Sequence, residues 1–183
     1  MSEETGDAPV VSTPAPGRYG IDVSNSGVTF KARHFFGLAE VTGTFAIAGG
    51  EIVVDPVVAK STATATVDAA SFRTNTPARD KAIRSRSYLH TDSHPTIGFV
   101  SSGLHEADGG WVLSGDLTVR EVTRPVELTV ERAEPTSAGF RAHATTQIDR
   151  HDFGVSGSRG MVGRYLTMSV DVTANRVATP GES

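Results

Sequence analysis

Short runs in which apolar and polar residues alternate make up most of this chain, and they constrain its fold more than any other feature. Residues 27–45, GVTFKARHFFGLAEVTGTF, hold two such runs on either side of Gly37. Side chains of a strand point alternately to the two faces of a sheet, so each run predicts a strand with one buried and one solvent-exposed face. His34 ends the apolar row of the first run, which places a titratable ring at the edge of any cavity that this hairpin encloses.

Further alternating runs follow, separated by turn residues. Strands are expected at 19–23, 57–69, 96–107, 111–120, 124–132, 139–148 and 165–173. The segment 51–55 is either the next strand or a continuation of the run before it after a bulge. The charged segment 71–89 has no alternation, and a helix is expected from about Pro77 to Arg86 with Thr76 as its N-cap. About eight strands predict an all-β fold, an eight-stranded antiparallel barrel with a short helical insertion, because closure removes exposed strand edges. A two-sheet sandwich of the same strands is the structural alternative.

The composition limits the classes of function. The 183 residues suit one domain, with 18–176 as the folded part between a disordered tail at 1–17 and a short tail at 177–183. The net charge is -4 and no basic block is present, so nucleic acid is not an expected partner. No apolar run is long enough to cross a bilayer, so stable membrane insertion is not expected. The acidic, proline-containing N-terminus lacks a signal-peptide pattern, and a cytoplasmic location is expected.

The strand expected at 57–69 has an unusual apolar face. It is built largely of alanine, at Ala59, Ala63 and Ala65, whereas a strand that faces a packed core normally presents larger groups. Either a bulky neighbour fills the space in front of these alanines, or the space belongs to a ligand. Both explanations are open at this point.

No arrangement of residues predicts a catalytic or metal site. The chain has no cysteine, which excludes disulfides, thiol catalysis and thiolate metal ligands. His90 and His94 have a metal-ligand spacing for a helix, but the residues between them and Pro95 after them indicate a loop. Residues 149–152, DRHD, suit a tight turn whose aspartates accept backbone hydrogen bonds. We therefore expect no metal, no cofactor and no enzymatic activity.

The chain resembles the YceI-like polyisoprenoid-binding family over about residues 17–175. The resemblance rests on four segments in the family's order, which are YGIDVSNSGVTFKARHFFG (19–37), SFRTNTPARDKAIRSRSYLHTDSHPTIGFVS (71–101), DLTVREVTRPVELTV (116–130) and IDRHDFGV (148–155). It implies an eight-stranded lipocalin-like barrel whose long apolar pocket holds a polyisoprenoid or another long-chain amphiphile. The chain departs from the family's pattern at residues 24–26, where it reads Ser-Asn-Ser in place of a histidine-containing turn.

With this resemblance, ligand-binding residues of two kinds are expected. The apolar candidates, which would surround the lipid tail, are Val28, Phe30, Ala32, Phe45, Ala63, Ala65, Phe99, Leu117, Leu166 and Met168. The polar candidates, which would contact the headgroup, are His34, Ser71, Thr74, Arg79, Arg84 and Arg86. Arginine suits this role because its guanidinium group matches phosphate geometry. The structural alternative is a fully packed core for the first set and ordinary hydrogen-bonded or ion-paired groups for the second.

The leading functional hypothesis is a protein that binds, stores or transports an isoprenoid quinone, a polyprenyl phosphate or a related lipid in the barrel interior. Two alternatives stay open. One is an enzyme that modifies such a lipid, with His34 and a nearby carboxylate as acid and base. The other is a stress-response protein whose barrel surface binds a protein partner. Where the barrel associates with itself, a homodimer is expected.

Overall fold

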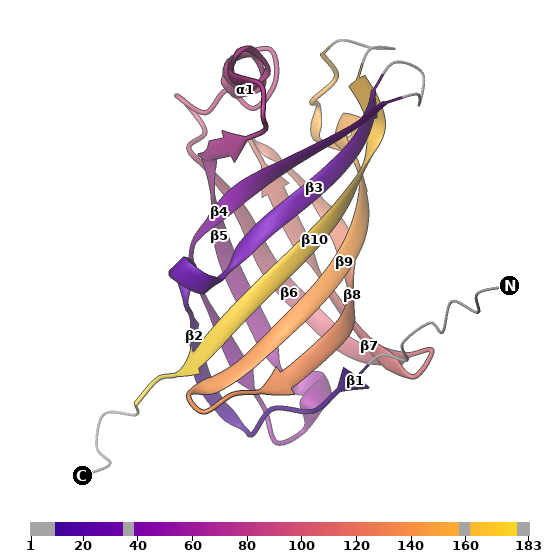
Figure 1. Cartoon of the computed structure of the whole chain (residues 1–183). Helices are drawn as coiled ribbons and strands as arrows, with labels where there is room; N and C mark the ends of the chain where they lie inside the picture. The colour runs from indigo at the N-terminus through magenta and orange to yellow at the C-terminus, as the bar shows by residue number, and fades with distance from the viewer. Residues whose placement is uncertain (1–9, 35–38, 158–161, 179–183) are drawn as a thin grey trace, which may run out of the picture.

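A closed barrel of antiparallel strands forms the body of the protein in the computed structural model, which describes residues 10–34, 39–157 and 162–178 (Figure 1). The barrel strands are β3 (Gly27–His34), β4 (Ala39–Val54), β5 (Thr62–Arg73), β6 (Thr96–Ala107), β7 (Gly110–Val119), β8 (Val122–Pro135), β9 (Gly139–Asp149) and β10 (Val162–Arg176). Each strand pairs with the next along the chain, and β10 also pairs with β3, which closes the ring. The predicted barrel is confirmed, and the sandwich is excluded by this closure.

Short turns hold neighbouring strands in register. Between β6 and β7, Asp108 and Gly109 both have positive φ angles, of 50° and 76°. Two successive positive φ values are typical of a type I′ turn, whose twist matches that of the two strands it joins. The long strand β4 is interrupted by register shifts near Phe45 and Ala48, and it continues to Val54. The segment 51–55 is therefore a continuation of this strand after a bulge, one of the two possibilities that the sequence offered.

The structure differs from the expected disordered tail in residues 10–16. A two-residue strand, β1 (Val10–Val11), pairs in parallel with β8, and Ser12 donates a backbone hydrogen bond to Ala133. This pairing uses backbone groups alone over two residues, too few for an alternating pattern to be visible in the sequence. Residues 1–9 lie outside the described part of the chain. Next come β2 (Gly17–Ile21) and the 3-10 turn η1 (Val23–Asn25), which lead into β3.

Packed side chains fill the barrel at the end that holds β2, the lower end in Figure 1. Tyr19, Val54, Phe140 and Ala174 are all buried and form one cluster. The rings of Tyr19 and Phe140 meet edge to face with their centroids 5.0 Å apart. Ala174 continues the inward-facing row of β10, so this cluster lies in the lumen and forms its floor.

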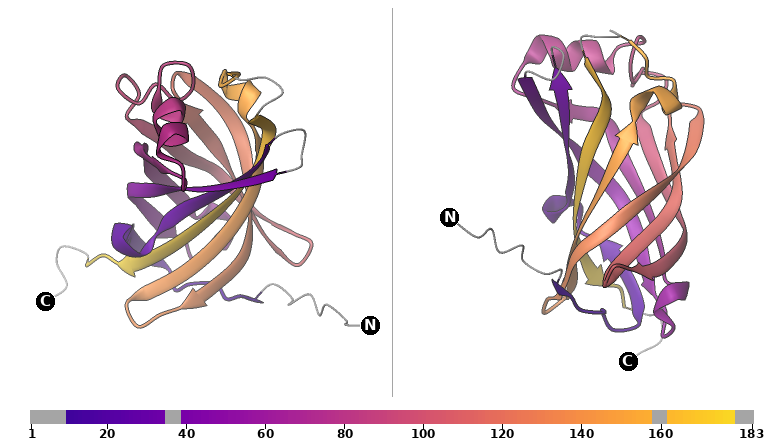
Figure 2. Two further views of the ribbon diagram at one scale, coloured as in Figure 1. Left: turned by 45° about the horizontal axis from the view of Figure 1, so that its top comes forward. Right: turned by 90° about the vertical axis from the view of Figure 1, so that its right-hand side faces the viewer.

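Helical segments gather at the opposite, upper end (Figures 1 and 2). They are α1 (Pro77–Arg84), between β5 and β6, and the 3-10 helix η3 (Arg150–Phe153), between β9 and β10. The 3-10 helix η2 (Val58–Lys60) precedes β5 at the lower end of the barrel. The helix α1 ends two residues earlier than expected, because Ser85 is extended, with φ -70° and ψ 169°. Thr76 is at the N-cap position, but its side chain makes no capping hydrogen bond.

Candidate functional site

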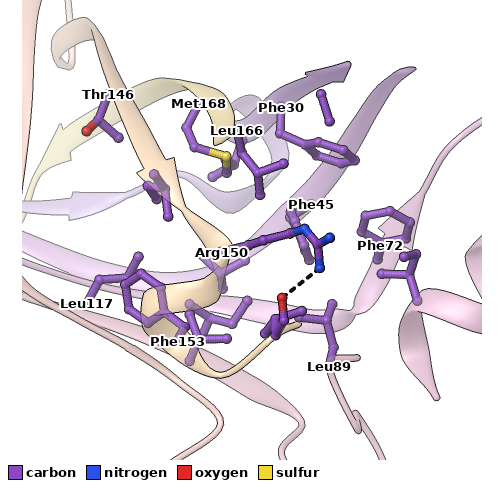
Figure 3. A pocket seen from close by; sticks show the side chains of 18 of the residues that line it. Phe30, Phe45, Phe72, Leu89, Leu117, Thr146, Arg150, Phe153, Leu166 and Met168 are labelled. Carbon is purple, nitrogen blue, oxygen red and sulfur yellow. Dashed lines mark hydrogen bonds between the residues drawn. The ribbon is translucent and has the colours of Figure 1, made fainter. Parts of the chain in front are cut away.

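A cavity of about 400 Å³ occupies the upper part of the barrel lumen (Figure 3). All eight barrel strands contribute inward-facing side chains to its wall, and α1, the turn after α1, and η3 contribute to its upper rim. The lining is almost wholly apolar. Among the lining residues only Arg33 and Ala82 are exposed, so the cavity reaches solvent at the α1 end. The barrel therefore has a packed floor and a mouth beside α1.

Strand register brings inward-facing residues together across neighbouring strands. Along β3 and β10, Val28 lies opposite Val170, and Phe30 lies opposite Met168. All four side chains line the cavity. Because side chains of a strand alternate, a single register places the whole apolar row of each strand inside the barrel.

Two glycines let aromatic rings lie flat against the wall. The ring of Phe30 covers Gly43, its partner on β4, and the ring of Phe99 covers Gly115 on β7. A Cβ atom at Gly115 would lie 2.5 Å from the Phe99 ring, which is too close for the ring to stay in place. These glycines keep two large rings out of the middle of the lumen, and the cavity occupies that space.

Aromatic packing tightens the cavity near α1. The ring centroid of Phe72 lies 5.1 Å from that of Phe30 and 5.3 Å from that of Phe45. Leu89, in the turn after α1, is buried against this group. Spacings of this size are favourable for aromatic pairs, so the α1 segment is held against the barrel by its own apolar contacts.

Most of the predicted apolar residues line the cavity. They are Val28, Phe30, Ala32, Phe45, Ala65, Phe99, Leu117, Leu166 and Met168. Ala63 does not line it, because it lies nearer the floor, opposite Ile52, which packs against the floor cluster. The two explanations for the alanine face thus apply at different heights: a neighbour packs near Ala63, and cavity space lies in front of Ala65. Contact of these residues with a ligand stays a prediction.

Three of the six predicted polar residues hold the protein together instead of lining the cavity. The Ser71 hydroxyl accepts a hydrogen bond from the Ala46 amide, and Arg84 donates from Nε and Nη2 to the Phe72 carbonyl. Thr74 donates to Asp80.

The remaining headgroup candidates differ in position. Arg86 is exposed and lies outside the lining. Arg79 lines the cavity. The backbone of His34 pairs with Ala39 and Val162, but its side chain lies outside the described part of the structure.

Arg150 is a cavity residue that sequence reasoning missed. It is only 5 % exposed, and Figure 3 shows it projecting into the space that Phe45 and Phe72 line. Its guanidinium group donates to the carbonyls of Val155 (2.7 Å), Gly157 (3.0 Å) and Gly163 (2.9 Å). Burial lowers the pKa of Arg150 from its usual value. The alternation of β9, continued two positions past Ile148, would have predicted this inward direction.

Residues 149–152 form a turn, and Asp149 accepts a backbone hydrogen bond in it, as the sequence predicted. The Asp149 carboxylate accepts a hydrogen bond from the His151 amide and caps η3. It also accepts a 2.7 Å hydrogen bond from Arg164, which is the main reason that the pKa of Asp149 lies below its usual value. This pair fixes the outer side of the turn and so fixes the direction of Arg150 on its inner side.

Asp80 anchors α1 to the end of β5. Its Oδ1 atom accepts hydrogen bonds from the Thr74 hydroxyl at 2.6 Å and from the Thr74 amide at 2.9 Å. The hydroxyl bond is the largest cause that holds the pKa of Asp80 below its usual value, and Arg84 adds to it. This stabilisation is therefore present above the unfolded-state pKa of about 3.9 and is lost as the pH falls through the lower folded-state pKa.

The Asp80→Asn variant is expected to be less stable than the wild-type protein at neutral pH, and the difference should shrink as the pH falls from about 5 to 2. Denaturant unfolding at several pH values measures it. The control is Asp116→Asn, since Asp116 is exposed on β7. A stability difference for Asp80→Asn that stays constant over this range would contradict the role given to the carboxylate.

The histidines of the chain do not form a metal site in the described residues. No cluster of three or more histidine, aspartate or glutamate side chains among them has an arrangement that could hold a metal ion. The His90 and His94 rings lie edge to face, 5.5 Å apart, in a turn, as the sequence indicated. None of the helices within residues 10–34, 39–157 and 162–178 has the length and apolar character needed to span a membrane.

Comparisons with known proteins agree with this architecture. Of the solved structures, BcnA from Burkholderia cenocepacia has a TM-score of 0.75 at 20% identity, covering 83% of this chain and 98% of that one. A polyisoprenoid binding domain from Saccharophagus degradans, implicated in plant cell wall breakdown, has a TM-score of 0.67 at 13% identity and covers 89% of this chain and 100% of that one. At these identities the likeness shows the fold.

Sequence relatives give the family. The UPF0312 protein plu2095 from Photorhabdus laumondii is 30% identical over 173 residues, with 90% of each chain covered. A UPF0312 protein from Shewanella putrefaciens, Sputcn32_2702, is 28% identical over 178 residues, with 92% of each chain covered. The sequence pattern of the YceI-like domain matches residues 19–174, which include the barrel strands from β3 to β10, except the last two residues of β10, and the whole cavity lining. The chain therefore belongs to the YceI-like domain family.

Proposed function

We propose that this protein binds one long-chain amphiphile, a polyisoprenoid or a lipid of similar shape, with the apolar tail in the barrel cavity. The observation that carries the proposal is the cavity itself: about 400 Å³, lined almost wholly by apolar side chains, with a packed floor and a mouth beside α1. Volumes of about 300–1,000 Å³ with such linings are typical of small-molecule sites. The YceI-like family and the polyisoprenoid-binding neighbour from Saccharophagus degradans support a lipid as the ligand class.

Burial of the tail supplies the driving force. Removal of apolar surface from water contributes roughly 25 cal/mol per Å², or about 0.8 kcal/mol for each CH₂ group. No directional contact is needed along the tail, which fits a wall in which Thr146 and Tyr88 are the uncharged polar exceptions. A carrier, a store and a sensor would all use this mode of binding. A cytoplasmic location for it stays an expectation of the sequence.

The floor sets the length of tail that fits. An apolar cavity of about 150 Å³ binds one benzene ring, which has six carbon atoms. In the same proportion, this cavity accommodates on the order of 16 carbon atoms, roughly three isoprene units. Tyr19 and Phe140 block extension through the floor, so a longer chain would project from the mouth.

A chain-length series tests the proposal. Geraniol, farnesol and geranylgeraniol have two, three and four isoprene units, and each is titrated against a neutral fluorescent probe bound to the protein. Affinity should rise about tenfold or more from geraniol to farnesol and by less from farnesol to geranylgeraniol, because the added carbons no longer find buried space. The stoichiometry should be one ligand per chain. Absence of saturable binding across the whole series would contradict the proposal.

A further inference from the structure

Charged groups at the cavity are all of one sign. Among the described residues that line it, the charged ones are Arg33, Arg79 and Arg150, and none is an aspartate or a glutamate. They come from three elements, β3, α1 and η3, which meet at the same end of the barrel (Figure 2). Arg33 is exposed, Arg79 is half-buried and Arg150 is buried, so the positive groups extend from solvent into the mouth.

Arg33 and Arg79 differ from the arginines that hold the fold together. Neither makes a hydrogen bond or an ion pair with any residue that the structure describes, whereas Arg84 and Arg150 donate to backbone carbonyls. The acidic residue opposite Arg33 in strand register is Glu40, which is exposed and forms an ion pair with Lys31. A half-buried guanidinium group beside an apolar cavity is costly unless an anion or several acceptors approach it.

The surroundings strengthen the positive character of this end. Residues 77–86, PARDKAIRSR, contain four cationic side chains and a single acidic one, Asp80, although the whole chain has a net charge of -4. The Asp80 carboxylate is turned toward Thr74, from which it accepts two hydrogen bonds. An anion near the mouth is therefore attracted by a local charge opposite to that of the protein as a whole.

We infer that Arg33 and Arg79 form a headgroup site that selects ligands with a carboxylate or a phosphate over neutral amphiphiles with the same tail. Arg150, held by its backbone acceptors deeper in the cavity, adds a fixed positive charge behind the site. Arginine binds carboxylate and phosphate oxygens through two parallel N–H donors, a geometry that a neutral hydroxyl group cannot match. The inference rests on the proposed function, and it adds the direction of binding, with the headgroup at α1 and the tail toward the floor.

Matched pairs of ligands test the inference. Farnesyl phosphate is compared with farnesol, and palmitate with hexadecanol, by displacement of the same neutral probe. The measured quantity is the ratio of the two dissociation constants within each pair. Hydrogen bonds to charged groups contribute about 1.5–3 kcal/mol, so the anionic member should bind at least about tenfold more tightly. The ratio should fall in about 1 M salt, since screening weakens the attraction at an exposed mouth.

A double variant assigns the preference to the two arginines. In Arg33→Gln/Arg79→Gln the ratio should fall to less than about threefold, with an unchanged far-UV circular dichroism spectrum as the check of folding. Arg124→Gln is the control, because Arg124 is an exposed arginine on β8 outside the cavity lining, and it should keep the wild-type ratio. The larger ratio of the two pairs identifies phosphate or carboxylate as the preferred headgroup.

The outcomes separate this inference from the proposed function. Equal affinity for the alcohol and the anion of both pairs overturns the headgroup site and leaves tail binding intact. The headgroup site is also overturned if Arg124→Gln lowers the ratio of dissociation constants as much as the double variant does. Binding of the protein to anionic vesicles, without a preference for the anion among the free ligands, overturns it as well. Failure of both members of both pairs to bind overturns the proposed function.

Discussion

Replacement of Ala65 by phenylalanine is expected to weaken binding of a lipid tail by about 100-fold or more, which corresponds to about 2.7 kcal/mol. Ala65 lines the cavity from β5, directly opposite Phe99 on β6. A ring at this position would project into the space in front of the alanine face and would overlap a tail on its way to the floor. Displacement titration with farnesol measures the loss.

Thr66→Phe is the matched control for Ala65→Phe. Thr66 is the next residue of β5, and its side chain is exposed on the outer face of the barrel. The same ring is thus added to the same strand without entering the lumen, and farnesol affinity should stay within about threefold of that of the wild-type protein. Unchanged binding by Ala65→Phe, with the fold intact by circular dichroism, would show that the tail does not occupy this cavity.

Replacement of Arg150 by methionine is expected to lower the free energy of unfolding by about 2–5 kcal/mol. Methionine keeps an unbranched stem but leaves three carbonyl groups, of Val155, Gly157 and Gly163, without the guanidinium donor. A buried acceptor that loses its donor costs about 1–3 kcal/mol, so the loss of the donor to several carbonyls accounts for a penalty of this size.

Denaturant unfolding of Arg150→Met measures this loss, with Arg124→Met as the control. Arg124 is exposed and, among the residues that the structure describes, donates only to the carbonyl of its neighbour Thr123, so its replacement should change stability by less than about 0.5 kcal/mol. Equal stability of Arg150→Met and Arg124→Met would mean that the buried guanidinium does not hold the rim of the cavity.

The sequence predicts the barrel and much of its lining because strand alternation is a local property. Once β3 and β10 are known to be strands, the row that contains Val28 and Phe30 and the row that contains Met168 must each face one way, and apolar rows face inward. The alternation is lost where the register shifts. Gly49 and Gly50 in β4 lie at such a shift, and the inward positions change from odd-numbered Ile47 to even-numbered Ile52.

The polar residues are harder to place from the sequence because their partners are distant or belong to the backbone. Ser71 binds the amide of Ala46, 25 residues away, and Arg84 binds the carbonyl of Phe72. Because both partners are backbone groups, which every residue has, neither hydrogen bond can be recognised from the amino-acid sequence. Arg150 was missed for a different reason: its charge indicated an exposed turn, whereas the alternation of β9 points it inward.

The cavity of the native protein is expected to hold one long-chain amphiphile. Native mass spectrometry of the protein, purified from cells without detergent, tests it directly, with organic extraction to identify what is released. We expect one apolar ligand per chain in the wild-type protein and in Thr66→Phe, and a much lower amount in Ala65→Phe. The bare mass of the chain in all three proteins, together with no uptake of added farnesol or farnesyl phosphate, would show that the barrel does not bind such a ligand.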